Sequence, residues 1–243
     1  MLPFRALNHY GRVMDFKQES YWYNIHPRLD NSEFIRMQLK LDPMENRATG
    51  VFDAISKGYA AVNLHRELDK KNEEAYLTSM EDNVGRDFSI SSYELVKERT
   101  DPQKVSQRVK FEIDNLFNGT MAYLDPFLIK FFTQNPFQLR ERNYPIDFGY
   151  PRSYKYQVSI PIPDGYVLDE FPKNQAMAVP GNTAILRFAI QNANNQLFLS
   201  FHLDIKDSYF EKEAYDSLKS LFSEVVNIQK NSLVVLRKKT VEP

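Results

Sequence analysis

Apolar and polar residues alternate along much of this chain. The alternation covers residues 34–41, 107–113, 156–162, 184–190 and 197–205. A period of two places one side of a strand on a core and leaves the other side to solvent. In the stretch 34–41, Ile35 and Met37 share one side, while Arg36 and Gln38 occupy the other. The pattern therefore predicts a protein built mainly from half-buried strands.

Two regions follow a helical period instead. Between residues 60 and 83, apolar side chains recur three or four positions apart, and the polar stretch 70–74 divides this region into two short helices. A further helix is expected near 212–229. The residues at helical spacing are Ala61, Leu64, Leu68, Tyr76 and Met80 in the first region and Ala214, Leu218, Leu221, Phe222 and Val225 in the second. This spacing packs one stripe of each helix onto a core.

Many alternating strands with only two helical regions favour antiparallel layers over a doubly wound parallel sheet. We expect a β-rich α+β fold with antiparallel, sandwich-like sheets in two packed parts. A middle β-rich domain would span residues 27–149, and a C-terminal sandwich-like domain would span residues 150–243. Residues 1–26 contain two short strand-like pieces, which are too small to bury a core alone. They are expected to add strands to the middle region.

The segment 135–151 connects the two expected parts and contains three prolines and four aromatic residues. Because proline restricts the backbone, the segment is predicted to be a fixed junction. Phe137, Tyr144 and Phe148 are expected to anchor it between the two parts, where aromatic rings bury a large apolar area.

Charge and composition exclude several function classes. The chain has 31 basic and 32 acidic residues, so no basic excess is available to neutralise nucleic-acid phosphates. It contains no cysteine, which removes disulfides, thiolate metal sites and cysteine nucleophiles. The most apolar run, residues 121–132, is interrupted and is shorter than the ~20 residues of a membrane-spanning helix. The first ten residues lack the apolar segment of a signal peptide. We expect no nucleic-acid partner, no membrane span, no metal and no cofactor.

Candidate catalytic residues are few. The four histidines are His9, His26, His65 and His202. None has the spacing of a zinc-binding helix, so structural or surface roles are expected. His202 lies between Ser200 and Asp204 on the polar side of a strand, where all three point the same way. Successive side chains in such a row are ~6.5–7 Å apart, too far for the contacts of a catalytic triad. The row is predicted to be a solvated face.

Two further groups of residues suggest binding. Arg140 and Arg142 could bind a carboxylate or phosphate, but we expect them to hold the junction to carboxylates such as Asp147. The run 21–23, Tyr-Trp-Tyr, could be a platform for sugars. In a strand Trp22 points away from the two tyrosines, so one side of the run is expected to be core.

Several motifs together resemble one known family. They are Leu2-Pro-Phe-Arg-Ala-Leu-Asn8, Gly11-Arg-Val13, Gly58-Tyr-Ala-Ala61, Gly119 with Asp125-Pro126, Asn135-Pro-Phe137, Arg142-Asn-Tyr-Pro-Ile-Asp-Phe148 and Ile162-Pro-Asp-Gly-Tyr166. They resemble the C-terminal region of transglutaminase-like proteins of Bacteroidetes, in which a Cys/His/Asp core is flanked by β-rich domains of unknown function. The resemblance covers nearly the whole chain, and the junction motif is its most specific part.

The resemblance implies that residues 1–26 are remnant strands following a transglutaminase-like core and that the core itself is missing. No catalytic residue carries over. The first hypothesis is therefore a non-catalytic accessory module, periplasmic or at the cell surface, that binds such a core in cis or in trans and self-associates through residues 1–26. A glycan- or peptide-binding module is the second hypothesis. An independent hydrolase, using carboxylates or the His202 row, is the third.

Overall fold

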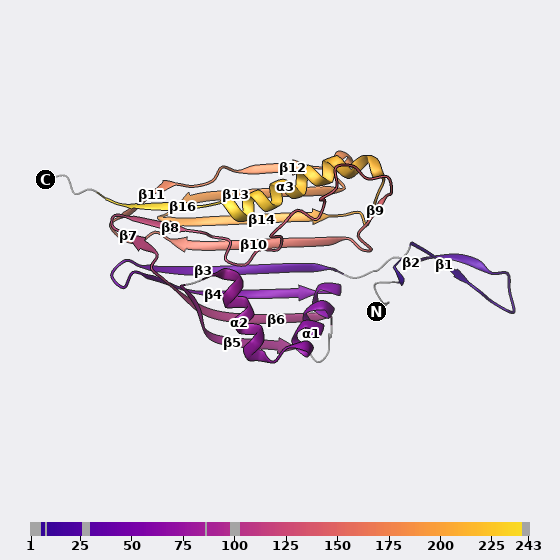
Figure 1. Cartoon of the computed structure of the whole chain (residues 1–243), viewed down its shortest axis with the longest axis horizontal. Coiled ribbons are helices and arrows are strands. Elements are labelled where there is room, and N and C mark those ends of the chain that lie inside the picture. The colour runs from indigo at the N-terminus through magenta and orange to yellow at the C-terminus, as the bar shows by residue number, and fades with distance from the viewer. Residues whose placement is uncertain (1–5, 8, 26–29, 86, 98–102, 240–243) are drawn as a thin grey trace.

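One large sheet dominates the molecule (Figure 1). The computed structural model describes residues 6–7, 9–25, 30–85, 87–97 and 103–239. The strands of the large sheet lie in the order β12-β13-β14-β10-β3-β4-β6-β5. Their bounds are β3 Ser32–Asp42, β4 Arg47–Lys57, β5 Phe88–Lys97, β6 Lys104–Asp114, β10 Arg152–Pro161, β12 Gln175–Ala178, β13 Ala184–Ala193 and β14 Gln196–Ile205. The β-rich α+β class with antiparallel sheets is thus confirmed.

The alternating stretches form these strands in the expected orientation. Along β3, residues Ile35, Met37 and Leu39 are buried, and the polar residues between them are exposed. The same alternation holds in β10 and β14, whose apolar residues enter the same core cluster. Each strand therefore presents one apolar face to the core, which the period of two predicts.

The β3–β10 pair joins the two halves of the sheet. Its strands run parallel, with Ile35 opposite Tyr156 and Met37 opposite Val158, whereas the neighbouring strand pairs of this sheet are antiparallel. Tyr156 is completely buried at this pair. Strands from both sides of residue 150 thus share one continuous sheet, and the domain boundary expected there stays a prediction.

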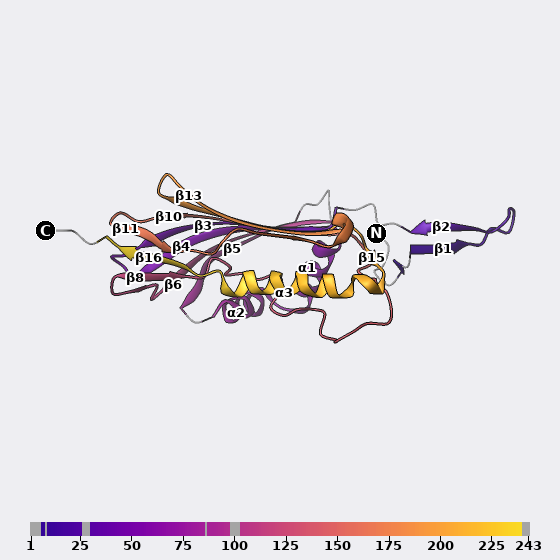
Figure 2. The ribbon, with the colours of Figure 1, turned by 90° about the horizontal axis from the view of Figure 1, so that it is seen from above.

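Helices cover one face of the large sheet (Figure 2). They are α1 (Tyr59–Lys70), α2 (Glu73–Val84) and α3 (Tyr215–Asn231). The break between α1 and α2 falls at the polar stretch predicted from the sequence. There the Asn72 side chain accepts a hydrogen bond of 2.7 Å from the backbone N–H of Ala75, which caps α2. In the described ranges, no helix combines the length and apolarity that crossing a bilayer requires.

A small sheet completes the same core. Its strands, in the order β11-β16-β8-β7, are β11 Tyr166–Glu170, β16 Val234–Lys238, β8 Met121–Leu124 and β7 Phe117–Asn118. Leu124, Val234 and Leu236 from this sheet belong to the main hydrophobic cluster. A two-stranded pair links β9 (Ile146–Asp147) with β15 (Tyr209–Phe210). Short 3-10 helices occupy Pro180–Asn182 and Lys212–Ala214.

The junction segment 135–151 packs on α3. Phe137 is buried, with edge-to-face contacts to Tyr215 and Phe222 at ring-centroid distances of 5.6 and 5.3 Å. Phe148 also packs against this core. The expectation for Tyr144 is wrong, because its side chain is 77% exposed. The segment crosses the surface with an irregular backbone, so sequence proximity to buried aromatics does not determine which rings point inward.

The amino-terminal strands do not extend the large sheet. β1 (His9–Val13) pairs antiparallel with β2 (Tyr21–Ile25) to form a separate hairpin. Figure 1 shows the hairpin projecting beyond one end of the large sheet. The expectation that these strands join the middle region is therefore wrong. The short connection between them makes pairing with each other entropically cheaper than pairing with a distant strand.

Candidate functional site

The histidine row differs from its predicted geometry. His202 Nε2 lies 2.9 Å from Asp204 Oδ1, although the two residues are two positions apart on β14. The predicted separation was too large because the two side chains lean toward one another along the strand. A hydroxyl also lies near, but it belongs to Ser153 of the adjacent strand β10, whose Oγ is 3.2 Å from the same nitrogen. Ser200 makes neither of these contacts.

This arrangement differs from a catalytic triad in one decisive respect. A triad histidine contacts its acid through one ring nitrogen and its nucleophile through the other. In this protein Asp204 and Ser153 both contact Nε2 of His202. One nitrogen cannot accept the serine proton while it donates its own hydrogen to the carboxylate. The cluster therefore has the hydrogen bonding of a polar surface network.

In the junction, Arg142 binds backbone carbonyls rather than an acid. Arg142 donates hydrogen bonds of 3.0 and 3.2 Å to the carbonyl oxygens of Tyr144 and Pro145. The Asp147 carboxylate instead accepts from the backbone N–H of Gly149. Arg142 therefore forms hydrogen bonds within the irregular segment instead of the expected ion pair with Asp147. Arg140 is exposed.

Of the other histidines, the structure describes the side chain of His65. His65 lies on α1, half-buried. His26 and the side chain of His9 lie outside the described residues. Within the described ranges, no three His, Asp or Glu side chains gather closely enough to hold a metal ion.

The hairpin exposes aromatic side chains on both of its faces. Trp22 is 62% exposed, and the guanidinium of Arg12 lies 5.5 Å from the centre of its ring. Tyr21 and Tyr23 point to the opposite side and are also exposed. Phe16, at the tip, is 99% exposed. The expectation that one side of the Tyr-Trp-Tyr run is core is wrong in the isolated chain, because neither face is covered.

A small cluster holds the base of the hairpin to the body. Leu7 is buried with Tyr59 of α1 and Tyr150, and Ile25 packs against them. The rings of Tyr59 and Tyr150 stack with centroids 4.6 Å apart. The guanidinium of Arg152 lies 4.3 Å from the centre of the Tyr150 ring. The hairpin is thus attached at its base, while its aromatic tip and middle project outward.

A partly buried acid lies beside this cluster. Burial raises the pKa of the Glu33 carboxyl above its ordinary value, and the positive charge of Arg152 opposes that rise. Arg152 itself donates a hydrogen bond of 2.5 Å to the carbonyl oxygen of Phe148. Glu33 is the first inward-facing residue of β3, paired with Tyr154 across the parallel strands. Its carboxyl therefore lies at the end of the core.

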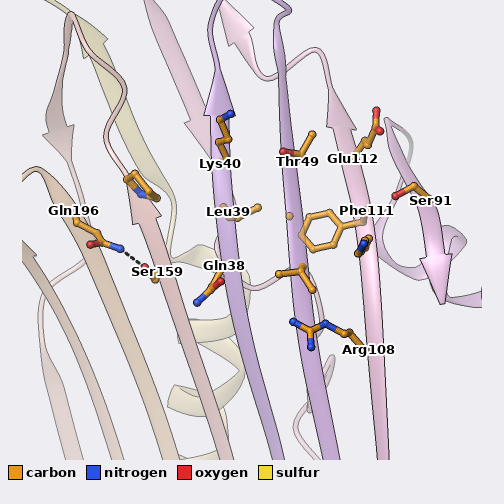
Figure 3. A pocket seen from close by; sticks show the side chains of 14 residues that line it. Gln38, Leu39, Lys40, Thr49, Ser91, Arg108, Phe111, Glu112, Ser159 and Gln196 are labelled. Atoms are coloured by element: carbon orange, nitrogen blue, oxygen red, sulfur yellow. Dashed lines mark hydrogen bonds between the residues drawn. The ribbon is translucent and has the colours of Figure 1, made fainter. Parts of the chain in front are cut away.

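The uncovered face of the large sheet contains a shallow groove (Figure 3). It consists of two adjoining hollows of about 600 and 470 Å³ that share Gln38, Ser159 and Gln196. The side-chain amide of Gln196 donates to the Ser159 hydroxyl across the β10–β14 pair. A bulge in β5, between Ile90 and Ser92, brings Ser91 to one end of the groove. Amides, hydroxyls and cationic side chains thus line a single surface.

The sequence contains no motif for this groove. Its residues occupy single polar positions on several strands, and each position by itself resembles the solvated side of a sheet. Only the strand order brings them together, and that order includes the distant β3–β10 pairing. The alternation of polar and apolar residues was nevertheless the signal that assigned these side chains to the outer face.

Part of the chain matches a described family. Residues 120–235 match the model of a family described as Domain of Unknown Function with solved-structure structure (DUF3858). The chain therefore contains a domain of unknown function. The matched residues include β10, β13, β14 and α3 but not β3–β6 or the hairpin. No curated protein matches the chain.

Proposed function

We propose that this protein is a non-catalytic interaction module that binds a transglutaminase-like catalytic core, in cis or in trans, through the β1–β2 hairpin. The observation that carries the proposal is the exposure of apolar and aromatic side chains on both faces of a projecting hairpin. An isolated two-stranded hairpin is marginally stable in water, so a partner surface would stabilise it. The motifs that resemble the transglutaminase-like family supply the kind of partner.

The side chains of the hairpin suit a protein interface. Tyrosine, tryptophan and arginine are enriched where binding energy concentrates, because each combines a large apolar surface with a polar group. Trp22 and Arg12 already stack on one face, and Tyr21 and Tyr23 occupy the other. A partner that contacts both faces of the hairpin would bury the side chains on each of them. The same exposed surface provides a route to self-association of the isolated chain.

The non-catalytic role is proposed from the reactive side chains that the chain contains. With no cysteine, the chain cannot form the thioester intermediate of a transglutaminase-like core. The His202 contacts through a single nitrogen do not supply a serine nucleophile with a general base. We expect no amidase, protease or transglutaminase turnover from the purified chain, measured as ammonia or amine release from peptide and glutamine substrates. Turnover that persists through repurification would contradict the proposal. A periplasmic or cell-surface location accompanies the proposed partner.

Binding can be measured with the tryptophan already in the hairpin. In the experiment, a transglutaminase-like catalytic core encoded by the same genome is titrated into a solution of the purified chain. We expect Trp22 emission to shift to shorter wavelength on binding, because the complex would remove the ring from water. Trp22→Ala should weaken binding in a sedimentation assay, whereas Tyr144→Ala, an exposed aromatic elsewhere, should not. Absence of binding, or equal binding by both variants, would refute the proposal.

A further inference from the structure

The groove on the uncovered face runs across the strands rather than along them. One register row joins Lys110, Val51 and Gln38 on β6, β4 and β3. The row continues from Gln38 to Ser159 on β10, and then to Phe198 and Gln191 on β14 and β13. All six residues line the groove. Adjacent strands are ~4.8 Å apart, so the row is roughly 24 Å long. That length accommodates several units of a linear polymer.

Cationic side chains without acidic partners lie along this groove. Arg36, Lys40 and Lys110 line it and are exposed, and in the described part of the chain no carboxylate lies within 4.0 Å of their charged groups. The remaining charged residues of the groove are neutralised by ion pairs. Arg108 lies 3.6 Å from Asp53, and Glu112 lies 3.1 Å from Arg47. Although the chain has a net charge of −1, the groove is therefore locally positive.

Neutral hydrogen-bonding groups surround these cations. They are the amides of Gln38, Gln157, Gln191 and Gln196 and the hydroxyls of Thr49, Ser91, Ser159 and Ser200. Phe198 adds a partly exposed ring at the β14 end. Amides and hydroxyls both donate and accept hydrogen bonds, which matches a ligand rich in hydroxyl groups. The ring offers an apolar surface against which a sugar face can pack.

We propose that this groove binds a linear acidic polysaccharide whose sugars carry carboxylate groups. Three unpaired cations would bind the carboxylates, and the amides and hydroxyls would bind the sugar hydroxyls. An extended peptide fits less well, because peptides that bind sheets pair along an edge strand and this groove crosses interior strands. Nucleic acid has one charge on every nucleotide and favours several stacking aromatics, whereas the groove offers three unpaired cations and Phe198.

The test measures binding of the full chain to soluble polygalacturonate, with dextran of similar length as the neutral control. We compare Arg36→Gln/Lys110→Gln with Lys155→Gln/Arg187→Gln. Lys155 and Arg187 are exposed on the same face of the sheet, where both lie opposite His202 on the neighbouring strand. Neither residue lines the groove. Each double variant removes the same charge. Thermal melting followed by circular dichroism establishes that both remain folded.

We expect polygalacturonate to bind and dextran to bind far more weakly. The groove variant should lose about tenfold or more in affinity, since it loses two charge-assisted contacts. The control variant should remain within about threefold of the original, because neither Lys155 nor Arg187 lines the groove. Equal losses in the two variants, equal binding of dextran, or tighter binding of a single-stranded DNA oligonucleotide than of polygalacturonate would each overturn the proposal. The result is independent of the hairpin's partner.

Discussion

Replacing Phe137 with alanine tests how the junction segment 135–151 is held in place. The Phe137 side chain is 6% exposed and its ring contacts Tyr215 and Phe222 of α3. Phe-to-Ala substitutions in a core cost about 3–5 kcal/mol, because the apolar transfer energy is lost and a cavity remains. Edge-to-face pairs contribute roughly 0.5–1.5 kcal/mol beyond their buried area, which favours the upper half of that range.

A loss of this size is a large share of the stability of an ordinary protein, about 5–15 kcal/mol. For a chain of 243 residues it should lower the melting temperature by roughly 8–20 °C. Urea unfolding followed by far-UV circular dichroism measures the change. Tryptophan fluorescence is unsuitable, because the chain's one tryptophan is Trp22, on the exposed hairpin.

Tyr144→Ala is the matched control in the same segment. Its side chain is 77% exposed, so its removal should change the free energy of unfolding by less than about 0.5 kcal/mol. If both substitutions had the same effect, or if Phe137→Ala left the unfolding midpoint unchanged, the assignment of Phe137 as the anchor of this segment would be refuted.

Three other substitutions have defined outcomes. Since burial raises the pKa of Glu33, ionisation of this carboxyl costs the folded state stability as pH rises. Glu33→Gln should therefore unfold at higher urea than the original at pH 7, and the difference should vanish below pH ~4; a constant difference would contradict this cause. At Gly50, an added Cβ would lie 2.3 Å from the Phe111 ring. Gly50→Ala should therefore lower the free energy of unfolding by about 1–3 kcal/mol. Adding Phe111→Leu to the same variant should recover part of this loss. Asn72→Ala should cost about 1 kcal/mol by removing the α2 cap, whereas Asn72→Asp should retain most of the stability; equal losses would exclude capping as the cause.

The local pattern of apolar and polar residues predicted many of the strands and helices well. Strands β3, β10 and β14 and the division between α1 and α2 follow from the period of apolar residues and from polar interruptions. These features depend on interactions between residues close in sequence and on burial of one face. Alternation also identified which side chains of β3 face the solvent, and these now line the groove.

Long-range arrangement could not be predicted in the same way. The pairing of Ile35 with Tyr156 joins residues far apart in the chain, and both strands are apolar enough to pair with several others. The hairpin was expected to join the body because it contains many apolar residues, but its short connection favours local pairing. The contact between His202 and Ser153 likewise depends on which strand lies beside β14. For the same reason, the grouping of the groove residues on one surface could not be predicted from the sequence.

The parallel seam between β3 and β10 makes each half of the large sheet dependent on the other. If the chain were cut near residue 150, one fragment would retain β3 and the other β10, each with a full row of unpaired backbone N–H and C=O groups at a new edge. Such long, uncovered edges invite pairing with another chain. Fragments would therefore tend to exchange strands between copies or aggregate, and two fragments expressed together would reassemble at this seam. Each half of the large sheet is therefore expected to need the other half to cover its β3 or β10 edge.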